Sequence, residues 1–132
     1  MTATVEKKAL QKKSQAQPDE VRPFKDGKGK MAVYSFGGQT MGRGEFEPGW
    51  RWSEHVKPIA GTDSCQATHT GIILEGKMVV KMTDGGAEVE YGPGDVFLMP
   101  PGHDAWVVGN KRCVLFDFTG VSQYAKPGGG KR

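Results

Sequence analysis

Turn-forming residues interrupt this sequence so often that no long helix fits between positions 31 and 118. The separators are Gly-Gly, Pro-Gly, Asp-Gly-Gly, Gly-Pro-Gly-Asp and Pro-Pro-Gly-His, and the 132 residues include 20 glycines and 8 prolines. Glycine and proline destabilise helix interiors, whereas they favour the tight turns that connect strands. The spacing therefore predicts an all-β domain, either a sandwich or a barrel.

The runs between these turns are short and apolar or alternating, which is the pattern of strands. The candidates are residues 31–36, 39–47, 50–56, 66–74, 77–83, 87–91, 95–99, 105–109 and 113–118. One connection, KPIAGTDSC at residues 57–65, is longer and lies between two histidines. Long loops in compact β domains often carry function.

The length of the chain is enough for one hydrophobic core. We predict a single barrel domain over residues 31–125, a disordered basic N-terminal arm over residues 1–30 and a flexible tail over residues 126–132. The arm is rich in Lys, Gln and Pro and lacks the aliphatic residues that a core requires.

Positive charge is concentrated at the two ends of the chain. The net charge is +3, and the region between the ends is acidic. Because the basic arm has interleaved acids, it is typical of a solvated leader, and we do not expect it to bind nucleic acid. The N-terminus lacks the apolar core of a signal peptide, and no run is long enough to span a membrane. These features predict a cytoplasmic protein with no membrane association and with both cysteines reduced.

The segment GPGDVFLMPPG, residues 92–102, resembles the second motif of the cupins. Gly94 is followed by five residues and then by Pro100-Pro101-Gly102. LEGKMVVKMTDGG, residues 74–86, is similar to the strand, turn and strand that close the first cupin motif. The resemblance spans roughly residues 40–119. It implies a double-stranded β-helix, or jelly-roll barrel, with a metal or small-molecule site inside.

The resemblance also implies which residues stand at the family's four metal-ligand positions. His55 occupies the first position and His69 occupies the position of the family's Glu, whereas Lys57 and Ala105 fill the other two. His103 lies two residues before Ala105 and shares its face of the strand.

All three histidines of the chain thus fall at or beside ligand positions. We predict that His55, His69 and His103 bind a divalent transition metal, namely Zn, Fe, Mn, Ni or Cu. Candidates for a fourth ligand are Cys65, Asp63, Glu45 and Glu47. The alternative is a metal-free binding or accessory cupin, because a protonated Lys57 at a ligand position repels a cation.

Strand alternation adds a second prediction. If residues 50–55 are extended, Arg51 shares the inner face with His55, and it either orients a ligand carboxylate or pairs with an internal acid. Trp50 and Trp52 would then face outward and need a cover, which predicts a homodimer. A bulge after Gly49 would instead bury both tryptophans and turn His55 away.

The predicted ligand is a small polar or carboxylate-bearing molecule in the barrel. Its candidate binding residues are Arg51, Lys57 and Trp106. The resemblance allows dioxygenase, isomerase or decarboxylase chemistry, and the sequence does not choose among these or decide whether the protein is an enzyme.

Overall fold

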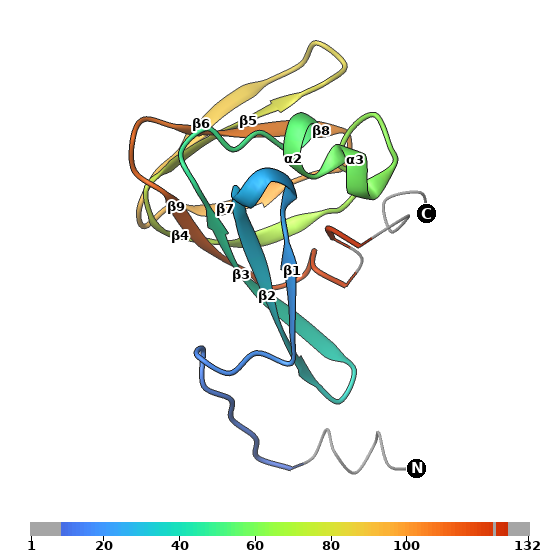
Figure 1. Cartoon of the computed structure of the whole chain (residues 1–132), viewed down its shortest axis with the longest axis vertical. Helices are drawn as coiled ribbons and strands as arrows, with labels where there is room; N and C mark the ends of the chain where they lie inside the picture. Colours follow the sequence, from blue (N-terminus) through green and yellow to red (C-terminus); the bar gives the residue numbers. More distant parts are fainter. Residues whose placement is uncertain (1–8, 123, 127–132) are drawn as a thin grey trace.

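Two antiparallel sheets face each other across the core of the computed structural model, which describes residues 9–122 and 124–126 (Figure 1). The larger sheet has six strands in the order β1 (Glu20–Pro23), β2 (Gly29–Phe36), β3 (Gln39–Phe46), β9 (Cys113–Asp117), β4 (His69–Glu75) and β7 (Val96–Met99). The smaller sheet has the order β6 (Glu88–Tyr91), β5 (Lys77–Met82) and β8 (His103–Val108). The expected all-β jelly roll is confirmed.

Every run predicted as a strand contributes one, except residues 50–56. That run forms α2 (Trp52–His55) and leads into α3 (Lys57–Ala60), both of which lie beside β8 in Figure 1. Pro58 stands in the first turn of α3, where its missing N–H costs nothing, and Gly61 ends the helix with φ of 81°. The extended conformation assumed for residues 50–55 is therefore wrong for residues 52–55, whereas Arg51 is extended and forms a bridge with Trp106.

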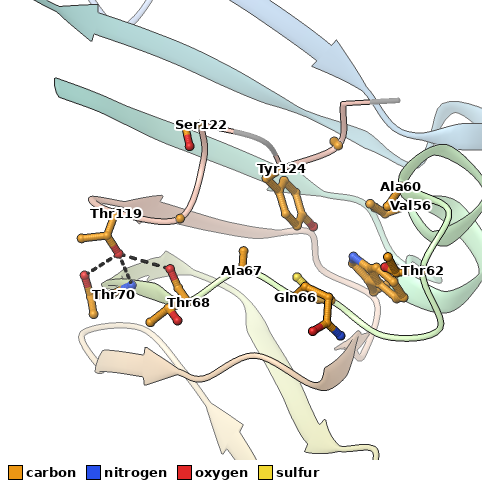
Figure 2. A pocket seen from close by; sticks show the side chains of 14 residues that line it. Val56, Ala60, Thr62, Gln66, Ala67, Thr68, Thr70, Thr119, Ser122 and Tyr124 are labelled. Carbon is orange, nitrogen blue, oxygen red and sulfur yellow. Dashed lines mark hydrogen bonds between the residues drawn. The ribbon is translucent and has the colours of Figure 1, made fainter. Parts of the chain in front are cut away.

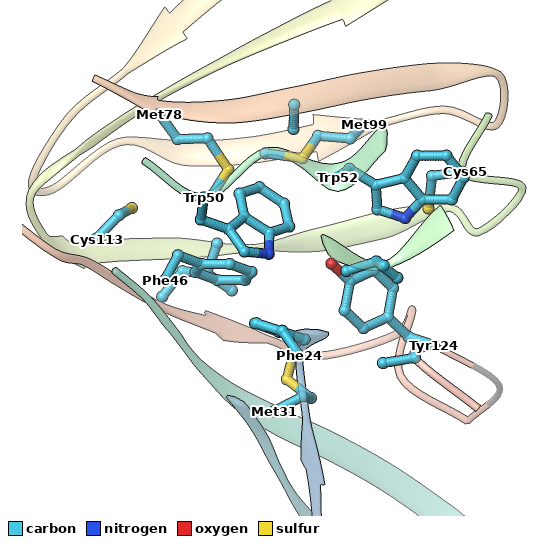
Figure 3. Packing of buried hydrophobic residues seen from close by; sticks show 14 of the residues in the cluster. Phe24, Met31, Phe46, Trp50, Trp52, Cys65, Met78, Met99, Cys113 and Tyr124 are labelled. Atoms are coloured by element: carbon cyan, nitrogen blue, oxygen red, sulfur yellow. The ribbon is translucent and has the colours of Figure 1, made fainter. Parts of the chain in front are cut away.

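The helical turn changes the environment of the two tryptophans. Trp50 and Trp52 are each only 2% exposed, so the prediction that they face outward is wrong. Trp50 packs edge-to-face on Phe46 with ring centroids 4.6 Å apart, and Figure 3 shows both indoles inside the core between Met78, Met99 and Tyr124. Aromatic burial on this scale is a large share of the stability of a small barrel.

The barrel also begins earlier in the chain than the sequence predicted. Residues 20–30 were assigned to the disordered arm, yet β1 pairs with β2, a 3-10 turn η1 (Lys25–Gly27) follows, and Phe24 is buried in the core. Arg22 donates a hydrogen bond of 2.8 Å to the Tyr124 carbonyl oxygen and so ties β1 to the C-terminal segment. Residues 1–8 and 127–132 of the predicted arm and tail lie outside the described residues.

Close approach between β4 and β9 requires a glycine at position 71. A Cβ added to Gly71 would lie 1.9 Å from the backbone oxygen of Phe116, which cannot move without displacing β9. Glycine here is a packing requirement, since Gly71 is not among the residues with positive φ.

We therefore expect Gly71→Ala to lower the free energy of unfolding by about 3 kcal/mol, as overpacking of a core does. Urea denaturation followed by circular dichroism measures it. Gly92→Ala is the matched control, because its nearest neighbour, a carbon of Lys77, lies at 3.8 Å. Equal stability of the two variants would contradict the proposed clash.

Candidate metal centre

Three buried side chains bring their donor atoms together at one end of the barrel. They are Cys65, His69 and His103, and their ligand atoms all lie within 4.8 Å of one another. His69 begins β4 and His103 begins β8, so the cluster joins the two sheets. Cys65 comes from the connection that follows α3.

Backbone pairing holds Cys65 against His103. The Cys65 N–H donates to the His103 carbonyl oxygen at 2.9 Å, and the Gly102 N–H donates to the Cys65 carbonyl oxygen at 2.7 Å. Gly102 adopts φ of 93°, which the Pro-Pro-Gly-His turn needs in order to present His103. The long connection is thus anchored to the turn at the position of the cluster.

Hydrogen bonds at Nδ1 fix the orientation of both imidazoles. His69 Nδ1 bonds to Asp117 Oδ2, and His103 Nδ1 bonds to the Pro100 carbonyl oxygen. A carbonyl and a carboxylate only accept, so Nδ1 carries the proton in each ring. When the ring is neutral, its Nε2 atom then has a lone pair for a ligand, and His69 Nε2 lies 3.5 Å from Cys65 Sγ.

Asp117 is itself fully bonded. Its Oδ1 accepts the N–H groups of Thr119, at 3.1 Å, and Gly120, at 2.9 Å, while its Oδ2 serves His69. Gly120 is required at this position, because a Cβ there would lie 2.2 Å from His69 Nδ1. A carboxylate behind a histidine is the usual support for a metal-binding imidazole.

The electrostatics of the cluster favour a thiolate. Burial raises the pKa of Cys65, but hydrogen bonding with His103 and His69 outweighs it and lowers that pKa to about 6. Burial lowers the pKa of His69, but the hydrogen bonds to Asp117 and Cys65 raise it to about 10. Without a metal, these shifts favour the thiolate–imidazolium form of the Cys65–His69 pair.

This donor set fits a transition metal. One thiolate and two imidazole Nε2 atoms are ligands that zinc, copper, nickel and iron accept, whereas manganese prefers oxygen ligands. The three donors are close enough that small side-chain shifts would bring them to metal-bonding distance. A site with three protein ligands leaves further positions for water or a ligand.

Two cavities meet at the cluster. Cys65 lines an outer cavity of about 460 Å³, whose rim in Figure 2 carries Thr68, Thr70, Thr119 and Ser122. His69 and His103 line an inner pocket of about 30 Å³ in the barrel core. Trp52 and Tyr124 line both cavities. The two cavities are therefore adjacent, and the outer one gives access to Cys65.

The structure leaves His55 apart from the other two histidines. His55 closes α2, and its Nδ1 accepts the Arg51 N–H at 3.0 Å, so the ring caps its own helix turn. The prediction placed His55 on a strand facing the barrel, and the helix removes that orientation. Of the candidate fourth ligands, Asp63 is exposed and Glu45 pairs with Arg43 and Arg112.

The predicted ligand-binding residues lie outside the barrel. The Arg51 guanidinium stacks over the Trp106 ring at 4.3 Å and faces Asp104 at 3.6 Å. Lys57 lies 3.8 Å from Asp63 beside a shallow hollow at the surface. Arg51 finds its acid on the surface, which corrects the prediction that it points inward.

Two residues of the site were underestimated or missed in the sequence. Cys65 was only a candidate fourth ligand, and Asp117 was not identified. The signal for Asp117 was present, because it is a single acid inside the apolar run CVLFDF and is only 1% exposed. A buried carboxylate of this kind requires a partner, which His69 supplies.

Comparison with known proteins agrees with this architecture. The family profile described as EutQ-like cupin domain matches residues 40–114, more than half of the chain. The protein belongs to this cupin family. No significant match is found among curated proteins.

Solved structures share the fold at low sequence identity. A protein of unknown function from Rhizobium leguminosarum bv. viciae is 22% identical, with a TM-score of 0.58 over 85% of this chain and 98% of that one. A sugar phosphate isomerase of the cupin superfamily from Silicibacter pomeroyi is 14% identical, with a TM-score of 0.59 over 86% of this chain and 77% of that one. At these identities the likeness shows the fold alone.

Within residues 9–122 and 124–126, no helix has the length and apolar character needed to cross a membrane.

The shared proton of the cluster predicts a specific dependence on pH in metal-free protein. In the unfolded chain, between the ordinary pKa values of 6.5 for His and 9.0 for Cys, the thiol carries one proton and the imidazole is neutral. In the folded protein the thiolate–imidazolium pair binds the same number of protons. Its contribution to stability is therefore constant in that range. It falls as pH rises through the His69 pKa of about 10, and also as pH drops through the Cys65 pKa of about 6.

We expect Asp117→Asn to lower the pKa of His69 and, as a result, to raise that of Cys65. The ultraviolet absorbance of the thiolate during a pH titration measures this change. Cys113 is an internal control that adds no thiolate absorbance below its own pKa, which burial raises to about 12. An unchanged thiolate titration in Asp117→Asn would show that the carboxylate does not support the pair.

Proposed function

We propose that this protein is a transition-metal cupin that binds a small polar or carboxylate-bearing molecule in its barrel. Cys65, His69 and His103 would hold the metal, in place of the three histidines expected from the sequence. The observation that supports this proposal is the orientation of the rings, since both Nδ1 atoms are bonded away from the cluster. Each Nε2 is thereby free to act as a ligand beside the thiol.

The outer cavity would admit the ligand. Its lining combines hydroxyl groups with apolar side chains such as Val56, Ala60 and Ala67. Such a mixture suits a small molecule with a few polar groups. A bound metal with open positions would act as a Lewis acid or as an oxygen-activating centre. The protein's own part would be to position the molecule through the cavity wall.

The alternative, a metal-free binding or accessory cupin, would keep the same three side chains joined only by hydrogen bonds. The two proposals differ in metal content. Metal binding would also release the proton shared by Cys65 and His69, because a ligand thiolate and imidazole must be deprotonated.

We expect protein purified without chelator to contain about one transition-metal ion per chain, the stoichiometry of a three-ligand site. Cys65→Ala, His69→Ala and His103→Ala should each lose most of it, as measured by mass spectrometry. His55→Ala and Cys113→Ser are the controls and should retain it. A metal-free wild type that takes up none on addition would favour the alternative.

We further propose that the protein forms a homodimer through strand β7. This strand is the edge of the larger sheet, and its Val96 and Leu98 are 79% and 61% exposed. Phe118 is also half exposed. An apolar strand edge is a surface on which a second copy pairs with the same edge of the first.

Leu98→Glu should convert the dimer to a monomer, because it places a charge on the apolar edge. Sedimentation velocity at micromolar concentration measures the change. Val21→Glu on the opposite edge strand β1, where Val21 is 48% exposed, is the matched control. A monomeric wild type would contradict the proposed dimer.

A further inference from the structure

Two buried hydrogen-bond donors in the barrel core have no acceptor. Trp50 Nε1 and Trp52 Nε1 are fully buried, and neither is paired with any of the described residues. An unpaired indole N–H inside a protein costs free energy that the fold normally avoids. Two of them at one place indicate a partner that is not part of the chain.

Both indoles line the inner pocket beneath the candidate metal centre. In Figure 3 the indole nitrogens of Trp50 and Trp52 and the hydroxyl of Tyr124 turn toward the space between these three side chains. His69 and His103 line the same pocket from the side of the cluster. The inner pocket therefore adjoins both the cluster and, through Trp52 and Tyr124, the outer cavity.

The lining residues His69, His103 and Tyr124 carry atoms that can accept a hydrogen bond, but neither indole N–H is paired with them or with any other described residue. Asp117 is the carboxylate among the lining residues, and its oxygens are used by His69, Thr119 and Gly120. Apart from these polar residues, the lining is apolar or aromatic, and includes Met31, Phe46 and Met99. Contacts between an N–H and an aromatic ring are too weak to replace a hydrogen bond.

The volume of the inner pocket limits the size of the group that can accept these hydrogen bonds. Its volume of about 30 Å³ has room for about two water-sized groups, since one such group needs about 10–15 Å³. A carboxylate presents two oxygens, each of which accepts one N–H. Its charge would be balanced by the metal that the proposed function places at the adjacent cluster.

We propose that the inner pocket is a carboxylate subsite in which the indole N–H groups of Trp50 and Trp52 each donate to one oxygen of the ligand. This inference rests on the proposed function, which supplies a small-molecule ligand that enters the barrel. It adds that the group bound in the inner pocket is a carboxylate. Selectivity for an acid would then come from the two indole N–H groups and not from Arg51, which the structure places on the surface.

Nuclear magnetic resonance of the indole N–H groups tests the proposal directly. The chain has 3 tryptophans and so gives three indole signals, of which Trp106 is the internal control because it stacks on Arg51 outside the barrel. Trp106→Phe identifies the control signal and leaves the core intact. Formate is the probe, and formamide is the uncharged probe of similar size.

Formate should shift two indole signals downfield with saturation, while the Trp106 signal stays in place and formamide has little effect. Trp52→Phe should weaken formate binding about tenfold or more, as expected for the loss of a hydrogen bond to a charged group. If Trp52→Phe fails to fold, the formate titration of the wild-type protein is sufficient to test the proposal.

Three results would overturn the subsite. Core indole signals that formate leaves unmoved would mean that the pocket holds water only. A linear shift of all three signals would mean non-specific binding, and equal shifts with formamide would exclude selection for a carboxylate. Titrating metal-loaded and metal-free samples separates this test from the proposed function, because metal content is measured independently of the indole signals.

Discussion

The hydrogen bond between Asp117 and His69 is the interaction on which the rest of the site depends. It fixes the ring of His69, directs Nε2 toward Cys65 and gives a deeply buried carboxylate its partner. Two further backbone N–H groups hold Asp117, and Gly120 leaves the space that the pair occupies. Because β4 and β9 are neighbours in the larger sheet, this contact connects the chemistry of the cluster to the closure of the barrel.

The fold followed from the sequence more completely than the site did. Turn residues and the spacing of Gly94, Pro100 and Gly102 were enough to predict a cupin barrel. The run at residues 50–56 misled the prediction, since alternating Trp and polar residues are compatible with a strand. The helix signals Pro58 and Gly61 lie in the following helix α3 and do not mark α2. The position of Cys65 was beyond sequence reasoning, because a long-range bridge to His103 sets it.

The helix at residues 52–55 has consequences beyond its own length. With this helix, Arg51 lies at the surface and His55 bonds to its own helical turn, while Trp50 and Trp52 are buried in the core. The barrel interior is therefore lined by two neutral indole N–H donors and not by the Arg51 cation. The barrel interior then combines a soft ligand set, an outer cavity with hydroxyl groups and a small inner pocket with unpaired N–H groups. A small acid that reaches the metal with one group and the indoles with its carboxylate would match this arrangement.

The central claim is that one thiolate and two imidazoles form the metal site, and X-ray absorption spectroscopy at the metal edge tests it most directly. The account predicts one sulfur scatterer together with two imidazole nitrogens in zinc-loaded protein. A first shell of nitrogen and oxygen alone would contradict it, because Cys65 would then not be a ligand.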